Sequence, residues 1–223
     1  MCKAFVLFSV LSWFICTAVL HAASRFSDEP EYAHDGPLPF KPADSYEQAL
    51  QSWRTPEDIN GWIAANFSYD TARAVQLSET QRTKNGLLSI YPPSAFFEGK
   101  RGVCVDLARF GVDTLRKIAP HSDPKYLMIE FDPVQVQGNM IRLHWLASFK
   151  RDGKIYFFAD SKRPGYIAGP YSETQAFIKE YEQYRGRRVV TFREPESYEK
   201  QRKTPAGKQQ RQKSPSHGTE PTH

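Results

Sequence analysis

Cys104 is the residue of this sequence whose side chain is best suited to act as a nucleophile. The chain contains three cysteines, and the other two, Cys2 and Cys16, lie in an apolar N-terminal segment. If that segment is cleaved, Cys104 remains as a single thiol. A lone thiol is either a small buried apolar residue or a reactive group, and composition leaves both interpretations open.

The residues that follow Cys104 predict that it stands at the start of a helix. Apolar and small residues recur there at spacings of three and four and then stop at Pro120; they are Cys104, Leu107, Ala108, Gly111, Leu115 and Ile118. A thiol in a first helical turn lies beside unpaired backbone N–H groups and the positive end of the helix dipole, which favour the thiolate. The same N–H groups can receive the oxyanion that forms when a thiolate attacks a carbonyl.

A cysteine nucleophile needs a base within hydrogen-bonding reach and a further group that orients the base. Five of the six histidines stand in the N-terminal segments, in a turn after Pro120 or near the C-terminus; they are His21, His34, His121, His217 and His223. His144 lies inside a hydrophobic stretch that predicts a strand. Taken by itself, His144 is better explained as a structural histidine, so its role depends on its neighbours.

Asp160 follows the next predicted strand, and the link between the two strands decides whether it meets His144. A two-residue turn at 152–153 pairs positions whose numbers sum to 305, which sets His144 opposite Ser161 and turns Asp160 to the other face. A three-residue loop with Gly153 left-handed pairs positions that sum to 304, which sets His144 opposite Asp160. We expect the bulged loop. Asp160 would then accept a hydrogen bond from one ring nitrogen, and the other nitrogen would face the thiol.

The rest of the pattern places helices first and strands afterwards. Two helical pieces are expected over 45–66, where Thr55-Pro56-Glu57-Asp58 is a strong start signal. Short helices are expected at 70–77 and 93–98. After Pro124, runs rich in aromatic and β-branched residues predict strands at 126–131, 139–149, 155–159 and 187–192. A helix is expected at 171–184. This order predicts an α+β fold built on an antiparallel sheet.

Both ends of the chain differ in composition from its middle. Residues 1–23 combine one lysine, an apolar run and small residues, the pattern of a secretory signal peptide. Retention of this segment as a membrane anchor is the alternative. We expect a polar, Pro-rich leader at 24–44, a catalytic domain at 45–193 and a basic tail without hydrophobic periodicity at 194–223, which is typical of disorder.

Several parts of the sequence form a pattern when they are taken together. They are Gly102-x-Cys104-x-Asp106-x-Ala108, His144 with an aromatic neighbour, Asp160 after the next strand, and the upstream stretch 63–70 (IAANFSYD). This pattern resembles the transglutaminase-like superfamily, which includes papain-fold bacterial cysteine proteases, over about residues 46–165. The resemblance implies a papain/transglutaminase-like fold, with a nucleophile helix packed on an antiparallel sheet, and a catalytic triad of Cys104, His144 and Asp160.

Two stretches depart from the pattern of that superfamily, at 91–101 (YPPSAFFEGKR) and at 161–171 (SKRPGYIAGPY). They leave the second oxyanion donor open, for which the candidates are Asn66, Tyr69 and Tyr91. We interpret Asp106 as a structural residue that tethers the start of the helix, rather than as a catalytic group.

These residues predict an exported, periplasmic or secreted cysteine hydrolase of the peptidase or amidase type that works through a thioester acyl-enzyme. Transfer of the acyl group to an amine, with protein crosslinking, is the alternative within the same chemistry. A catalytically inactive binding or scaffold module is the alternative outside it. We expect a protein or peptide substrate; the sequence assigns no cofactor and no metal-ligating residues, and it leaves a dependence on calcium or another metal open. The modest formal charge of +5 predicts no specific nucleic-acid binding, although the basic tail can contact an anionic surface weakly.

Overall fold

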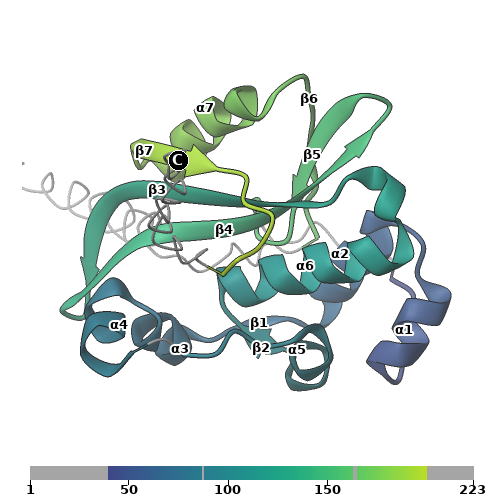
Figure 1. Cartoon of the computed structure of the whole chain (residues 1–223), viewed down its shortest axis with the longest axis horizontal. Helices are drawn as coiled ribbons and strands as arrows, with labels where there is room; N and C mark the ends of the chain where they lie inside the picture. The colour runs from purple at the N-terminus through teal and green to yellow at the C-terminus, as the bar shows by residue number, and fades with distance from the viewer. Residues whose placement is uncertain (1–39, 87, 163–164, 200–223) are drawn as a thin grey trace, which may run out of the picture.

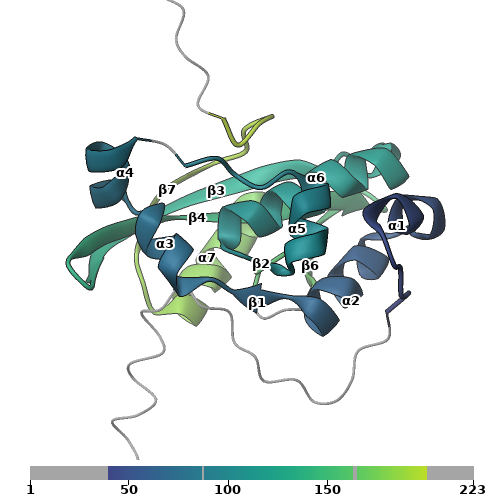
Figure 2. The same ribbon diagram turned by 90° about the horizontal axis from the view of Figure 1, so that it is seen from below.

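One antiparallel sheet forms the centre of the protein. The computed structural model describes residues 40–86, 88–162 and 165–199. The strands of the sheet are β3 (Lys125–Val136), β4 (Asn139–Arg151), β5 (Lys154–Phe158), β6 (Ala168–Tyr171) and β7 (Val189–Arg193), in the order β6-β5-β4-β3-β7. Helix α6 (Cys104–Ile118) covers one face of this sheet and helix α7 (Thr174–Arg185) covers the other (Figures 1 and 2).

Five helices precede α6 in the described residues, and a side chain caps the backbone at the start of the first four. They are α1 (Tyr46–Ser52), α2 (Pro56–Asn66), α3 (Thr71–Gln76), α4 (Glu79–Asn85) and α5 (Pro93–Gly99). Ser45, Thr55, Asp70 and Ser78 each accept a hydrogen bond from the N–H three residues further on, which fixes the starts of α1 to α4. Of these helices, α1, α2 and α5 pack against α6, and α3 reaches it through the side chain of Arg73.

Two hydrophobic clusters lie on opposite sides of the sheet, because alternate strand residues point to opposite faces. The cluster on the α6 face contains Trp62 and Phe110, and β4 contributes Ala147 to it. The cluster on the α7 face contains Ile129 and Phe177 together with Leu146 of β4. We call these two sides the α6 face and the α7 face.

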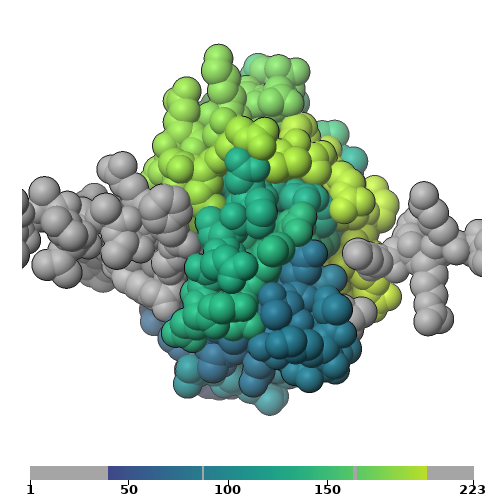
Figure 3. All heavy atoms as spheres, turned by 90° about the vertical axis from the view of Figure 1, so that its left-hand side faces the viewer, coloured from purple at the N-terminus to yellow at the C-terminus, as the bar shows by residue number. Residues whose placement is uncertain are grey.

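The hairpin of β3 and β4 extends beyond the helices that cover the sheet. Its turn residues, Gln137 and Gly138, have φ values of 49° and 73°. Its pairing shifts register between Glu130 and Val134, where Pro133 has no N–H to donate. Figure 3 shows this hairpin between the α3–α4 segment (blue) and the α7–β7 segment (yellow-green).

The predicted α+β class is confirmed, with the helix that begins at Cys104 packed on an antiparallel sheet. The short helices expected at 70–77 and 93–98 are α3 and α5. Strand β6 was not predicted, because Gly169 and Pro170 are depleted in strands; its place at the edge of the sheet tolerates them. The parallel pair β1 (Ser68–Tyr69) and β2 (Arg101–Gly102) is too short to give a pattern.

Several expectations concern residues outside the described ranges. The predicted signal peptide at 1–23 lies wholly outside them, as do the predicted leader up to residue 39 and the tail from residue 200. The start of the predicted tail is described and contacts α6: Arg116 donates a hydrogen bond to the Glu196 carbonyl (3.0 Å), and Arg109 lies 4.6 Å from the ring of Tyr198. None of the helices in the described ranges has the combined length and hydrophobicity of a membrane span. The domain boundaries remain predictions.

Candidate active site

Cys104 is the first residue of α6, and the short strand β2 precedes it in the chain. β2 pairs with β1 so that Tyr69 lies beside Gly102. A Cβ atom at position 102 would lie 2.9 Å from both the Cβ of Asp106 and the Cε2 of Phe96, so only glycine fits where the chain enters the helix. The Cys104 residue is 7% exposed. A buried thiol in the first turn of a 15-residue helix agrees with the predicted placement.

A buried carboxylate holds the start of α6 in place. Asp106 accepts hydrogen bonds from the backbone N–H groups of Val103 (3.1 Å) and Tyr91 (3.0 Å). It also accepts two from the guanidinium of Arg73, at 2.7 and 2.9 Å. The Arg73 guanidinium lies 3.7 Å from the centre of the Tyr91 ring. These contacts agree with the interpretation of Asp106 as a tether. The N-cap residue, Val103, has no polar side chain, so it does not cap the N–H groups of the first turn.

His144 lies in β4 with its imidazole on the α7 face. It pairs across the sheet with Ile129, which belongs to the cluster on that face. The imidazole centroid lies 5.8 Å from the ring of Tyr181 and 6.4 Å from the ring of Phe131. The side chain of His144 is fully buried.

Oxygen atoms surround one nitrogen of this imidazole. The Nε2 atom of His144 lies 2.9 Å from the Tyr181 hydroxyl, 3.3 Å from the backbone carbonyl oxygen of Asp160 and 3.8 Å from its carboxyl oxygen Oδ2. The Nδ1 atom has no hydrogen-bond partner among the described residues. Burial, followed by the positive charge of the nearby Arg185, holds the pKa of His144 well below its usual value of 6.5, so the ring is neutral at neutral pH.

The register predicted between β4 and β5 is wrong. The two strands are joined by a two-residue turn at 152–153, where both φ values are positive (51° and 70°), as a type I′ turn requires. Paired positions such as Ala147 and Phe158 sum to 305, so the bulged loop does not form. A tight turn matches the right-handed twist of the two strands better than the bulge that we expected.

Asp160 nevertheless reaches His144, by a different route. Strand β5 ends at Phe158, and Ala159 and Asp160 both adopt left-handed backbone conformations, with φ values of 55° and 76°. Such a conformation costs a non-glycine residue about 1–2 kcal/mol, so the surrounding packing must hold it. This turn places Asp160, which is 1% exposed, beside the imidazole on the α7 face.

Cys104 and His144 lie at about the same position along the length of β4, but on opposite faces of the sheet. A Cβ at Gly111 of α6 would lie 3.1 Å from the Ala147 Cβ, and Figure 1 shows α6 and β4 running in the same direction. Cys104 lies about 10 Å before Gly111 along the helix, and His144 lies about 10 Å before Ala147 along the strand. The structure therefore brings Asp160 to His144, but no hydrogen bond joins the Cys104 thiol to the imidazole.

Sequence reasoning missed Tyr181 and Arg185, which belong to the surroundings of His144. Arg185 donates a hydrogen bond to the Tyr181 hydroxyl (3.5 Å), and both residues are buried. A signal was present, because Phe177, Tyr181 and Arg185 repeat every four residues along the predicted helix and so share its buried face. A buried arginine one turn from a buried tyrosine indicates a polar contact inside the protein.

The three candidates for a second oxyanion donor differ in their surroundings. The side-chain amide of Asn66 donates to the Trp62 carbonyl (3.0 Å), and the ring of Tyr91 lies under Arg73. Tyr69 lies beside Gly102, two residues before the thiol. No group of three or more His, Cys, Asp or Glu side chains in the described ranges is arranged to hold a metal ion.

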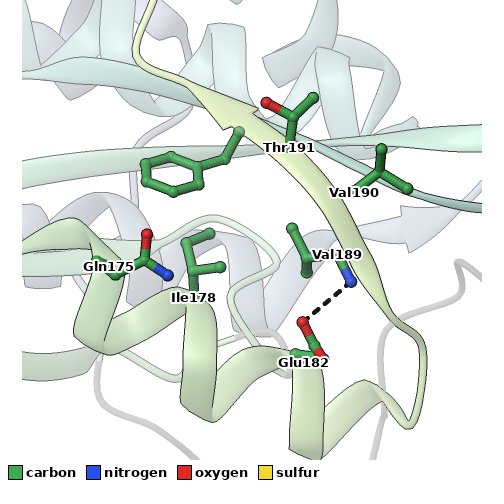
Figure 4. A pocket seen from close by; sticks show the side chains of 7 residues that line it. Gln175, Ile178, Glu182, Val189, Val190 and Thr191 are labelled. Atoms are coloured by element: carbon green, nitrogen blue, oxygen red, sulfur yellow. Dashed lines mark hydrogen bonds between the residues drawn. The ribbon is translucent and has the colours of Figure 1, made fainter.

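A shallow pocket of about 270 Å³ lies between α7 and the edge strand β7. Figure 4 shows its lining, in which Glu182 accepts a hydrogen bond from the Val189 N–H (3.1 Å). The lining contains none of the three predicted site residues; it consists of Gln175, Ile178, Glu182, Val189, Val190, Thr191 and Phe192.

Comparison with known proteins gives one family and one structural likeness. The family model for a transglutaminase-like domain matches residues 45–188, well over half of the chain. LapG of Legionella pneumophila is 15% identical in sequence, and the match covers 57% of this chain and 77% of LapG at a TM-score of 0.24. An EGTA-treated LapG structure gives the same identity and TM-score. So low a TM-score adds nothing to the family match. No curated protein matches the chain.

Proposed function

Because this chain belongs to the transglutaminase-like domain family, we propose that it is an exported cysteine-dependent hydrolase of the peptidase or amidase type. Cys104 is the proposed nucleophile, His144 is the proposed base, and Asp160 helps to orient the base. The proposed substrate is an amide bond in a protein or peptide. Export is proposed from residues 1–23, whose composition is that of a signal peptide.

One observation carries this proposal: the buried imidazole of His144 is held through one nitrogen, and its other nitrogen has no hydrogen-bond partner within the described residues. Nε2 contacts Tyr181 and Asp160, whereas Nδ1 has no hydrogen-bond partner in the described part of the chain. Leaving a buried polar atom without a partner costs about 1–3 kcal/mol, which makes this nitrogen a candidate for a contact made during the reaction. A neutral imidazole nitrogen is the atom that takes the proton from a thiol.

The thiol must move toward this nitrogen before it can lose its proton. The pairing of β4 with β5 begins only at Ala147, so the β5 side of β4 at His144 lies beyond this pairing. The proposal requires the thiol and the imidazole to approach each other around that edge. Catalytic hydrogen bonds are often long in unliganded enzymes and shorten when the substrate binds.

The proposed reaction then proceeds in two halves. His144 takes the thiol proton, and the Cys104 sulfur forms a bond to the amide carbonyl carbon. The first-turn N–H groups of α6 receive the oxyanion. The imidazolium gives its proton to the leaving amine as the C–N bond breaks, which leaves a thioester. Water attacks this thioester, with its proton passing to His144, and the free acid and the thiol are released.

Alkylation by iodoacetamide tests the nucleophile and the base together. The full chain is labelled at several values between about pH 5 and pH 9, and mass spectrometry follows the peptide that contains Cys104, so the other two cysteines do not interfere. We expect alkylation well below the ordinary thiol pKa of about 8.5 and a strong decrease in His144→Gln. His121→Gln, at an exposed histidine, is the matched control. An ordinary thiol profile that is the same in all three proteins would contradict the proposal.

A second experiment separates hydrolysis from acyl transfer. Unfolded casein is incubated with the protein and a fluorescent primary amine, and new amino termini and incorporated dye are both measured. Hydrolysis predicts new termini without dye. Dye incorporation that requires Cys104 would instead indicate acyl transfer to amines. Neither signal, together with an unreactive Cys104, would indicate an inactive binding module.

A further inference from the structure

The closest polar contact of His144 comes from α7 and not from the predicted triad. The Tyr181 hydroxyl lies 2.9 Å from Nε2, whereas the Asp160 carboxyl oxygen lies 3.8 Å from it. We propose that Tyr181 is a positioning residue that holds His144 with its ring proton on Nε2 and its lone pair on Nδ1. This inference rests on the proposed function, because it concerns His144 as the base.

The oxygen atoms around Nε2 determine where the ring proton lies. The backbone carbonyl oxygen of Asp160, 3.3 Å from Nε2, can only accept a hydrogen bond. This long contact favours a proton on Nε2, and the Tyr181 hydroxyl adds a second, closer oxygen at 2.9 Å; a proton on Nε2 leaves Nδ1 without one. The opposite tautomer would leave an N–H group at Nδ1 without an acceptor in the described part of the protein, and buried N–H groups without acceptors are rare.

The contacts of Tyr181 agree with this arrangement. A phenol hydroxyl has one proton to donate and two lone pairs that accept. Arg185 can only donate, and its Nη1 lies 3.5 Å from the Tyr181 hydroxyl. The Tyr181 hydroxyl donates to the Asp160 carbonyl (3.4 Å), so it meets Nε2 at 2.9 Å as an acceptor. All three contacts are made at once only when Nε2 carries the proton.

The position of Tyr181 is itself fixed by packing. Its ring centroid lies 5.1 Å from Phe177 and 6.2 Å from Phe131, and the residue is fully buried. Replacement by phenylalanine keeps these ring contacts and removes only the hydroxyl. Tyr184 provides a matched control on the same helix, since its hydroxyl donates to the Lys162 carbonyl (3.4 Å) and its ring lies 6.1 Å from that of Tyr181.

The test combines the tautomer of His144 with the reactivity of Cys104, both in the full chain. Nitrogen-15 NMR of the imidazole distinguishes a protonated nitrogen from an unprotonated one, and its signals are assigned by their loss in His144→Gln. We expect Nε2–H in the wild type. In Tyr181→Phe we expect a larger share of the Nδ1–H tautomer and about tenfold slower alkylation of Cys104, the size expected for one hydrogen bond. Tyr184→Phe should match the wild type in both measurements.

The outcomes separate this inference from the proposed function. An Nδ1–H tautomer in the wild type overturns the inference without any variant. Wild-type tautomer and alkylation in Tyr181→Phe also overturn it, provided that His144→Gln still slows the alkylation of Cys104. If His144→Gln has no effect on alkylation, the proposed function fails instead. A slow Tyr181→Phe variant with the wild-type tautomer shows that the hydroxyl acts on Cys104 by some means other than the tautomer of His144, and overturns the inference as well.

Discussion

The two faces of the sheet hold their buried polar groups differently. Near the α6 face, Asp106 is surrounded by donors: two from the Arg73 guanidinium and two backbone N–H groups. On the α7 face, the imidazole of His144 is bound through one nitrogen, and its other nitrogen has no hydrogen-bond partner among the described residues. Beside it, Asp160 stands in a left-handed backbone conformation that non-glycine residues seldom adopt.

This difference separates a group that supports the site from a group suited to react. A carboxylate that already accepts hydrogen bonds from four donors has no acceptor capacity left for a substrate. Asp106 therefore acts as a structural group, and its bond to the Val103 N–H fixes where α6 begins. Strained backbone and incompletely bonded buried polar groups occur most often where a protein does chemistry. The thiol is positioned by the saturated group, and the proposed base belongs to the other side of the sheet.

The largest expected loss of stability comes from removing the arginine that pairs with Asp106. Arg73→Ala would leave the Asp106 carboxylate buried without its guanidinium partner, and breaking a buried ion pair costs about 3–5 kcal/mol of unfolding free energy. Urea unfolding followed by circular dichroism measures this loss. Because Asp106 also binds the N–H of Val103, we expect Cys104 to alkylate with altered kinetics in the same variant.

Arg151→Ala is the matched control for this prediction. Arg151 forms a short ion pair with Glu57 (2.8 Å), but the two side chains are 42% and 50% exposed. Exposed pairs contribute about 0–1 kcal/mol, so this loss should be small and should decrease further in salt. Equal losses in the two variants would remove the distinction between the two faces, because the pair at Arg73 would then behave like a surface pair.

Local signals predicted most of what lies on the α6 face. Thr55-Pro56-Glu57-Asp58 marked the start of α2, because a capping residue followed by proline and acids satisfies the first N–H groups of a helix. The spacing of apolar residues after Cys104 marked α6 and its buried side. The role of Asp106 could be inferred but its partner could not, because Arg73 is 33 residues away in the sequence and no local rule connects the two.

The α7 face shows where such reasoning fails. The register of β4 and β5 depended on the choice between two turns that differ by one residue, and both suit Asp152-Gly153. His144 and Asp160 were still correctly expected to be neighbours, but for a reason that is wrong. The left-handed pair at Ala159 and Asp160 is imposed by tertiary packing, since alanine disfavours that conformation and two such residues in a row follow no local signal.

The next expected effect is a pH dependence that belongs to the α7 face. The pKa of His144 is lower in the folded protein than in the unfolded chain, where it is near 6.5. Below that pH the unfolded chain takes up a proton that the folded state does not. The contribution of His144 to the free energy of unfolding is therefore fully present above pH 6.5. It decreases as the pH falls below 6.5, by up to about 1.4 kcal/mol per pH unit. Urea unfolding at several pH values measures the slope.

His144→Gln should flatten this slope, whatever its stability at neutral pH. His121→Gln, at an exposed position, provides the comparison for general effects of losing a histidine. The quantity to compare is the difference in slope between variants, because carboxylates elsewhere titrate equally in all of them. A slope in His144→Gln as steep as in the wild type would mean that the imidazole is not held neutral by the α7 face.

The smallest expected effect compares two glycines, one on each side of the sheet. Gly186 follows α7 with a φ of 59°, and a Cβ there would meet no atom within 4 Å, so Gly186→Ala strains only the backbone and should cost about 1 kcal/mol. Gly99 ends α5 with similar open space and no left-handed φ, so Gly99→Ala should gain up to about 1 kcal/mol. Thermal unfolding measures both changes.

The same two variants also test whether the end of α7 acts on the imidazole. Arg185 is the last residue of α7 and donates to the Tyr181 hydroxyl, so a strained cap at Gly186 acts one residue from that contact. We expect Gly186→Ala to slow the alkylation of Cys104 slightly, by about twofold or less, the effect of a few tenths of a kcal/mol. Gly99→Ala should leave the alkylation rate unchanged. If Gly99→Ala slows the alkylation and Gly186→Ala does not, the reactivity of the thiol depends on the α6 face and not on the contacts of His144.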